Sequence, residues 1–150
     1  MEEEVLIERR KERKANPLLS KYEKSFDNSI SILLNSRKGL KPQAVFDFIS
    51  LSQFAPPVIE QLLKKTIKTF TNYKEQNTLL DAVISEKLLK LFALYNKGIS
   101  VFGSVEEFNK WMGEAVFGLG YQVPREILDT ITGIDLVGEE LTRIEYGDLA

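Results

Sequence analysis

The stretch SVEEFNKWM, Ser104 to Met112, shows how this chain is built. Ser104 and Glu107 have the spacing of a capping box, in which the serine oxygen and the glutamate carboxylate each accept an unpaired N–H of the first helical turn. Phe108, Trp111 and Met112 then follow at the spacing of one helix face. The stretch therefore predicts a short amphipathic helix, with Trp111 as a core anchor rather than a ligand platform.

Further short helices, with residues that typically start or end a helix at their boundaries, are predicted upstream of this stretch. Pro42 and the pair Pro56-Pro57 suit first helical turns, where the missing proline N–H costs nothing. A longer helix is expected from about Leu80 to Leu94, with Gly98 as its stop. The apolar island from Ile30 to Leu34 is too short to distinguish a strand from a helix edge.

Downstream, Pro124 is expected to start a helix that reaches Ile131, and Thr132 to Asp135 has capping-box form with Asp in place of Glu. Val137, Leu141 and Ile144 form the apolar stripe of a final helix. Nothing after residue 35 calls for a sheet, so the predicted fold class is all-α.

Composition is that of a globular chain. The sequence has 150 residues, of which 43% are hydrophobic and 28% charged, which suits one domain or two small ones sharing a core. No apolar run approaches the roughly 18–20 residues that a membrane span needs. The N-terminal MEEEVLIERRKERK lacks the apolar core of a secretory signal. We therefore expect a cytoplasmic protein that does not enter a membrane.

The residue types favour a binding protein over an enzyme. The chain has no cysteine and no histidine, which excludes disulfides, Cys/His zinc sites and imidazole catalysis. Gly118-Leu119-Gly120 is only a fragment of a dinucleotide fingerprint. Neither Glu106-Glu107 nor Glu139-Glu140 converges on a substrate, because neighbours on a helix point about 100° apart; Glu139 and Glu140 are expected on the surface. No enzymatic activity, cofactor or metal is predicted.

Charge is distributed unevenly along the chain. Residues 1–38 and 39–94 each carry a net charge of +2, whereas residues 95–150 carry −6. The segment from Lys64 to Glu75 presents polar and basic side chains opposite an apolar stripe, as a helix-turn-helix DNA reader does. The alternative is a solvated lysine face on a small helical domain. The candidate DNA-binding residues are Lys64, Lys65, Thr66, Lys68, Thr69, Asn72 and Lys74.

The last third of the chain resembles a known family. The order and spacing of its short motifs from Val101 to Gly147 resemble those of the toxin-binding domain (DUF2384) of Xre/MbcA/ParS-type antitoxins. The motifs that match are Val101-Phe102-Gly103, Trp111, Leu119-Gly120, Pro124, Leu128-Asp129-Thr130, Gly133 and Arg143 to Gly147. The expected core of this domain is Phe102, Trp111, Leu119, Pro124, Leu128, Val137 and Leu141.

The resemblance extends more loosely upstream, to about residue 30. Thr66-Ile67-Lys68-Thr69-Phe70 takes the place of the family's recognition-helix motif, although Thr71, Asn72 and Tyr73 follow where many relatives have arginines. The resemblance implies three parts: a variable charged arm (1–35), an Xre-like helix-turn-helix domain (36–97) and a toxin-binding domain (98–150).

The resemblance also implies the function. The chain is expected to be the antitoxin of a type II toxin–antitoxin pair, a homodimer without catalysis of its own. It would neutralise a RES-domain, NAD-degrading toxin by occluding the active site with its C-terminal region, and it could repress its own operon by binding DNA. The alternative is a stand-alone helix-turn-helix regulator. The predicted toxin-binding residues are Arg143, Ile144, Tyr146, Gly147, Asp148, Leu149 and Ala150, with Gly147 ending the last helix in a left-handed turn.

Overall fold

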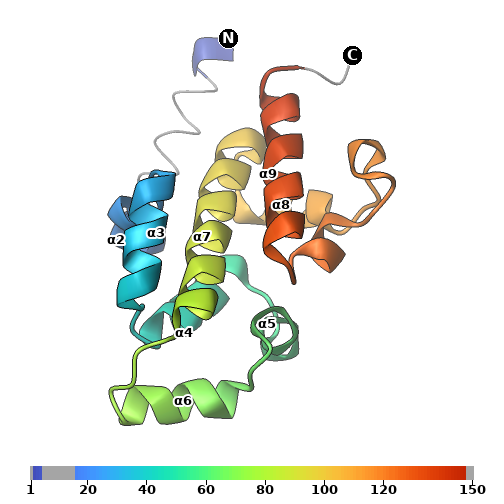
Figure 1. The fold of residues 1–150 in the computed structure, drawn as a ribbon. Coiled ribbons are helices and arrows are strands. Elements are labelled where there is room, and N and C mark those ends of the chain that lie inside the picture. The colour runs from blue at the N-terminus through green and yellow to red at the C-terminus, as the bar shows by residue number, and fades with distance from the viewer. Residues whose placement is uncertain (1, 5–15, 148–150) are drawn as a thin grey trace. The chain divides into compact units, whose positions relative to one another are not determined.

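The computed structural model describes residues 2–4 and 16–147. In these residues the regular structure is helical, and the only strand-like pairing is the isolated bridge between Val116 and Gln122. The all-α prediction is confirmed. The elements in chain order are α2 (Pro17–Phe26), α3 (Ser29–Lys38), α4 (Gln43–Ser52), α5 (Pro56–Leu63), α6 (Ile67–Glu75), α7 (Ala82–Phe102), α8 (Val105–Met112), η1 (Phe117–Leu119), η2 (Pro124–Ile127) and α9 (Ile131–Glu145) (Figure 1).

The chain divides into two compact units. One comprises residues 21–93, and the other comprises residues 94–150 together with residues 1–20. One boundary falls inside α7, and the other falls inside α2. Helix α3 runs across the predicted boundary at residue 35. The three predicted parts, 1–35, 36–97 and 98–150, stay predictions, and most of the charged arm lies outside the described residues.

Aromatic rings fill the core of the 21–93 unit. Phe92 stacks on Tyr22 with ring centroids 4.4 Å apart and meets Phe48 edge-on at 5.4 Å. Phe48, Phe70 and Phe92 are fully buried. Such pairs stabilise a core beyond the apolar area they bury, because the edge of one ring is attracted to the face of another.

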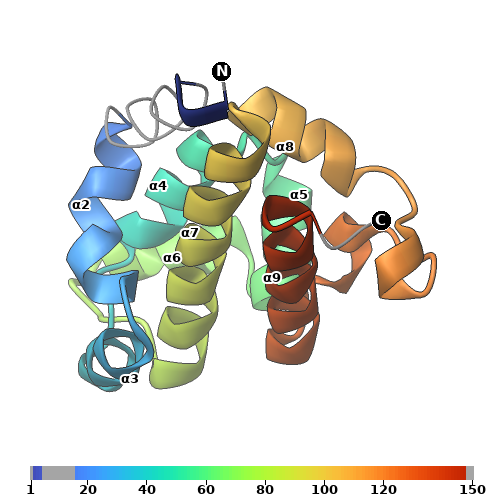
Figure 2. The same cartoon turned by 90° about the horizontal axis from the view of Figure 1, so that it is seen from above.

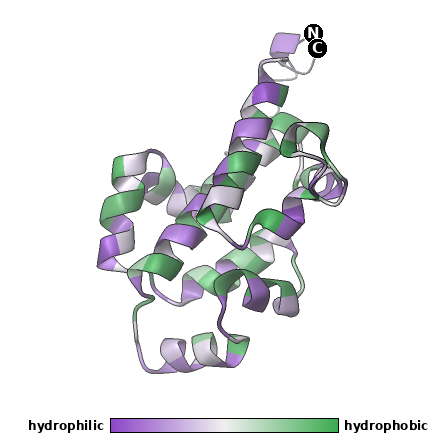
Figure 3. Cartoon of the chain, turned by 45° about the vertical axis from the view of Figure 1, so that its right-hand side comes forward, coloured by the Kyte–Doolittle hydropathy of each residue, from purple (hydrophilic) through white to green (hydrophobic). Residues whose placement is uncertain are grey.

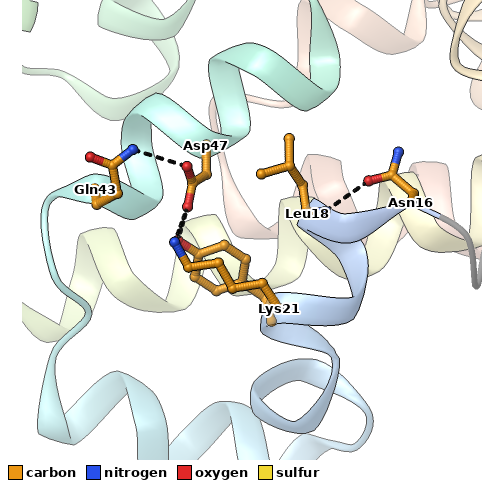
Figure 4. A network of polar contacts seen from close by, with 6 residues as sticks. Asn16, Leu18, Lys21, Gln43 and Asp47 are labelled. Atoms are coloured by element: carbon orange, nitrogen blue, oxygen red, sulfur yellow. Dashed lines mark hydrogen bonds and ion pairs between the residues drawn. The ribbon is translucent and has the colours of Figure 1, made fainter.

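A buried carboxylate ties the first helix of this unit to α4. Asp47 accepts hydrogen bonds from Tyr22 Oη at 2.5 Å, Lys21 Nζ at 2.8 Å and Gln43 Nε2 at 3.0 Å (Figure 4). Burial alone would raise the pKa of the Asp47 carboxyl, but these donors and the Lys21 charge hold that pKa below its usual value. Burial, together with the bond to Asp47, raises the pKa of the Tyr22 hydroxyl.

In the other unit, the C-terminal half of α7 lies beside α9 and supports α8 (Figures 1 and 2). Tyr95, on α7, is fully buried; its hydroxyl donates to Asn109 Oδ1 at 2.6 Å and its ring meets Phe108 at 5.0 Å. Burial raises the pKa of Tyr95 well above its usual value, against the opposing charge of Arg125. Lys97 donates to the Thr142 hydroxyl on α9. Asn16, in the N-terminal segment that belongs to this unit, caps α2 by accepting from the Leu18 N–H at 3.0 Å (Figure 4).

The prediction that Gly98 stops the long helix is wrong. Helix α7 continues to Phe102, and Gly103 follows it with a φ of +95°. Gly98 is required for packing instead, because a Cβ at this position would lie 2.4 Å from the ring of Phe108. A glycine inside a helix can thus mark a close approach rather than an end.

Two further local predictions need correction. The cap of α9 is Thr130, whose hydroxyl accepts from the Gly133 N–H at 3.0 Å, and not Thr132. The helix expected from Pro124 to Ile131 is a short 3-10 helix over Pro124–Ile127, and residues 128–130 form a turn that separates it from α9.

Two other segments also have their structure defined. The apolar segment from Ile30 to Leu34, for which the sequence did not decide between strand and helix, lies inside α3. The cap of α8 is Ser104, which accepts from the Glu107 N–H at 3.1 Å.

Candidate partner-binding surfaces

The end of α9 presents its last residues to solvent. Tyr146 is 73% exposed and serves as the C-cap. Gly147 follows with a φ of +74°, the left-handed conformation in which glycine commonly ends a helix. The predicted toxin-binding residues Asp148, Leu149 and Ala150 lie outside the described residues. The described part of the tail therefore contributes one accessible aromatic ring.

Arg143 and Ile144 are half-buried and face other parts of the unit. The guanidinium of Arg143 donates from Nε at 2.9 Å and from Nη2 at 2.5 Å to Glu140 Oε2. Its side chain stays 39% exposed, whereas that of Glu140 is completely buried. Glu140 therefore fixes the direction of Arg143, and the expectation that Glu140 is a surface residue is wrong.

A pocket of about 250 Å³ lies next to this ion pair. Apolar and aromatic side chains form much of its lining, and the lining residues are Trp111, Glu114, Ala115, Val116, Phe117, Gly118, Glu140 and Ile144. The absence of a side chain at Gly118 leaves room for Glu140, because a Cβ there would lie 2.2 Å from Oε2 and 2.5 Å from Oε1. Within the described part of the chain, Glu140 Oε1 has no hydrogen-bond partner.

Two aromatic side chains extend this surface on the loop between α8 and η2. Phe117 is 77% exposed and Tyr121 is 67% exposed, and their rings meet edge-on at 5.5 Å. Exposed aromatic residues that are held rigidly are common anchors of protein–protein interfaces. The sequence pattern does not distinguish these two residues from buried aromatic side chains.

The predicted core of this unit is only partly enclosed. Phe102 and Trp111 are half-buried, with ring centroids 5.3 Å apart and planes tilted by 31°, so Trp111 contributes to both the interior and the pocket wall. The remaining predicted core residues are buried, and they are Leu119, Pro124, Leu128, Val137 and Leu141.

Helix α6 carries the predicted DNA-binding residues of the other unit. Its apolar side packs inward through buried Phe70, and pale and purple segments predominate along the helix at the bottom of Figure 3. The exposed members of the predicted set are Lys64, Thr66, Lys68, Asn72 and Lys74, whereas Lys65 and Thr69 are half-buried. The hydroxyl of Thr66 accepts from the Thr69 N–H at 3.2 Å and lies 3.0 Å from the Thr69 hydroxyl. The Thr66 hydroxyl thus caps the helix, and the Thr69 hydroxyl contacts it.

A carboxylate also lies at the start of α6. Glu60 Oε2 accepts from the Ile67 N–H at 2.7 Å, so an acidic group occupies the place where a helix N-terminus could bind a phosphate. At the other end, Lys74 Nζ lies 5.4 Å from the ring of Phe46 and lines a pocket with Lys41 and Asn77. The basic surface is therefore stronger along the exposed side and C-terminal end of α6 than at its N-terminus.

A search of the described residues finds no group of three or more acidic side chains placed to hold a metal ion. None of the described helices combines the length and hydropathy needed to cross a membrane.

Comparison with protein families gives a match to the C-terminal part of the chain. Residues 97–147, about a third of the chain, match the family described as the antitoxin Xre/MbcA/ParS C-terminal toxin-binding domain. A comparison with curated proteins finds no match. The matched residues include the end of α7, the pocket, the ion pair and all of α9. The match confirms the family predicted for this region and supports an antitoxin role.

Proposed function

We propose that this chain, whose residues 97–147 belong to the Xre/MbcA/ParS toxin-binding family, is the antitoxin of a type II toxin–antitoxin pair. Its proposed partner is a RES-domain, NAD-degrading toxin, which it inhibits as a homodimer by covering the entrance of the active site with its C-terminal region. The proposal includes no catalysis by the antitoxin itself. The observation that carries it is the family match over the segment that displays Tyr146 outward.

Physical features of α9 support the C-terminal residues as the inhibitory contact. Tyr146 offers a rigid ring and a hydroxyl, a combination that is frequent among the residues that dominate binding energy. The net charge of −6 over residues 95–150 suits a cleft that accepts anionic substrates. Arg143 is a poorer probe of this contact, because its removal would leave Glu140 buried without a partner and destabilise the unit.

Deleting Tyr146 to Ala150 tests the proposal. Tyr146 and Gly147 are exposed, so the melting temperature should stay within a few degrees while inhibition of the cognate toxin weakens at least tenfold. Tyr146→Ala should show part of this loss. Lys110→Ala, which removes an exposed side chain from α8 of the same unit, is the control and should keep inhibition. Full inhibition by the truncated chain would refute the tail contact, and failure of the intact folded chain to bind the toxin would refute the antitoxin role.

The second proposed activity is binding of operator DNA by α4 to α6. Helices α5 and α6 are joined by Lys64 to Thr66, a connection of the length common in helix-turn-helix motifs, with Lys64 in the left-handed conformation. Lys68, Asn72 and Lys74 are exposed along α6. A chain that binds its promoter but no toxin would favour the alternative of a stand-alone regulator.

A further inference from the structure

Helix α3 has its hydrophobic residues on the outside. Ile30 is 69% exposed, Leu33 48% and Leu34 58%, while the buried residue of this fully described helix is Ser36. No hydrogen-bond partner for the Ser36 hydroxyl occurs among the described residues. Helices in globular proteins gain most of their stability by burying an apolar face. The apolar face of α3 is therefore built to be covered.

The exposed residues form one continuous stripe. Ile30, Leu33, Leu34 and Arg37 follow the spacing i, i+3, i+4 and i+7, which places them on a single side of the helix. Asp27 lies just before the N-cap Asn28, and Arg37 lies in the last turn. The apolar stripe is thus bounded by a negative charge at one end and a positive charge at the other.

This arrangement is complementary to itself. When two copies of α3 pair antiparallel about a twofold axis near Ile32, residues whose numbers add to 64 face each other. Within the helix, Ile30 then opposes Leu34 of the second copy and Leu33 opposes Ser31 of the second copy. Asp27, which precedes the N-cap, lies at the same end of the pair as Arg37 of the second copy, and the symmetry repeats this charge pairing at the other end. A twofold interface requires this kind of self-complementary patch.

We propose that the exposed face of α3 is the surface through which two copies of this chain associate. The inference rests on the homodimer that forms part of the proposed function, and it locates the dimer contact outside the matched residues 97–147. Three apolar side chains per copy are fewer than in a standard-size interface. The α3 pair is therefore expected to dimerise in a concentration-dependent way.

A single engineered thiol tests the axis directly, because the full-length chain contains no cysteine. Leu33 lies within one residue of the proposed axis, so L33C should form a covalent dimer on mild oxidation that a reductant reverses. Thr71→Cys, at an exposed position on α6, is the matched control and should stay monomeric. Equal yields of dimer from the two variants would overturn the proposal.

A charge swap tests the pairing. Asp27→Arg and Arg37→Asp should each weaken the dimer at least tenfold in sedimentation equilibrium, because each places like charges in opposition. The double variant D27R/R37D should restore it, which happens only when the two positions lie close to each other between copies. Both residues are exposed, and unchanged thermal unfolding would show that the single variants still fold.

Other occupants give different results. If residues 5–15 of the same chain cover α3, the protein is monomeric at every concentration and the charge swap changes its unfolding rather than its mass. If the toxin covers α3, the dimer is insensitive to the swap and Ile30→Lys weakens toxin binding instead. Either result overturns the proposal, while inhibition by the intact chain would leave the antitoxin role standing.

Discussion

At the scale of single residues, we expect alanine substitutions at two helical glycines of the same unit to change the stability of the fold in opposite directions. A Cβ on Gly98 would overlap the ring of Phe108 at 2.4 Å, whereas one on Gly138 would meet only Leu94 Cδ1 at 3.9 Å. We expect Gly98→Ala to destabilise the protein by about 1–3 kcal/mol through overpacking. Gly138→Ala should stabilise it by up to about 1 kcal/mol, because alanine is the better helix former. Urea unfolding of both variants checks this, and equal effects would contradict the packing role of Gly98.

The Asp47 carboxyl predicts a pH-dependent contribution to stability. Its pKa is lower in the folded chain than its ordinary value near 3.8, so ionised Asp47 stabilises the fold above that pH and its contribution disappears as pH falls through the folded value. Asp47→Asn should cost roughly 2 kcal/mol at pH 7, because three hydrogen bonds lose their charged acceptor. The difference from the native chain should shrink by pH 3.

Urea unfolding at pH 7 and pH 3 gives the comparison. Glu23→Gln, at an exposed position on α2, is the control substitution and should change stability little at either pH. A destabilisation by Asp47→Asn that is the same at both pH values would mean that shape rather than charge matters at this position.

At the scale of elements, α6 depends on capping at its first turn. Thr66→Ala removes the hydroxyl that accepts from the Thr69 N–H and should cost about 1 kcal/mol. Thr71→Ala, on the exposed side of the same helix, removes no such cap and should be neutral or slightly stabilising. Chemical denaturation of the two variants distinguishes them. Equal stabilities would indicate that the Glu60 carboxylate alone is enough to hold the first turn.

Local chemistry in the sequence predicted elements better than it predicted how they pack. Ser104 as a cap and the proline-led starts of α5 and η2 follow from interactions within a few residues, which a sequence displays directly. The sequence around Gly98 does not show why a glycine is needed there, because the ring that approaches it, Phe108, belongs to the next helix. In general, a glycine required for close packing and a glycine that ends a helix look alike until the neighbouring element is known.

The toxin-binding residues stay a prediction, and the side chains packed around them could be anticipated only in part from the sequence. The resemblance to the family's motifs indicates that the last helix carries the contact residues. It does not indicate that Glu140 is buried, because that burial depends on Gly118, which lies 22 positions earlier in the chain. The i,i+3 spacing of Glu140 and Arg143 was the available signal for their ion pair. The exposed pair Phe117 and Tyr121 carries no such signal, because aromatic residues are more often buried than displayed.

At the scale of the whole molecule, the uneven charge predicts that the two proposed activities can be separated by mutation. The lysines of α6 belong to the 21–93 unit, and Tyr146 belongs to the unit that carries the net charge of −6 over residues 95–150. Each phosphate contact contributes about 0.9 to the slope of log affinity against log salt. Lys68→Gln with Lys74→Gln should therefore flatten the slope for operator DNA by about 2 and leave toxin inhibition unchanged.

The complementary variant changes the other unit. Deletion of residues 146–150 should weaken toxin inhibition and keep the native salt slope, while Lys110→Gln, an exposed lysine on α8, should change neither property. Fluorescence anisotropy over a salt series and a toxin activity assay, both with full-length chains, measure the two effects. If either variant lost both operator binding and toxin inhibition, the two activities would not be separable. A substitution on the surface of one unit would then have changed the activity of the other unit.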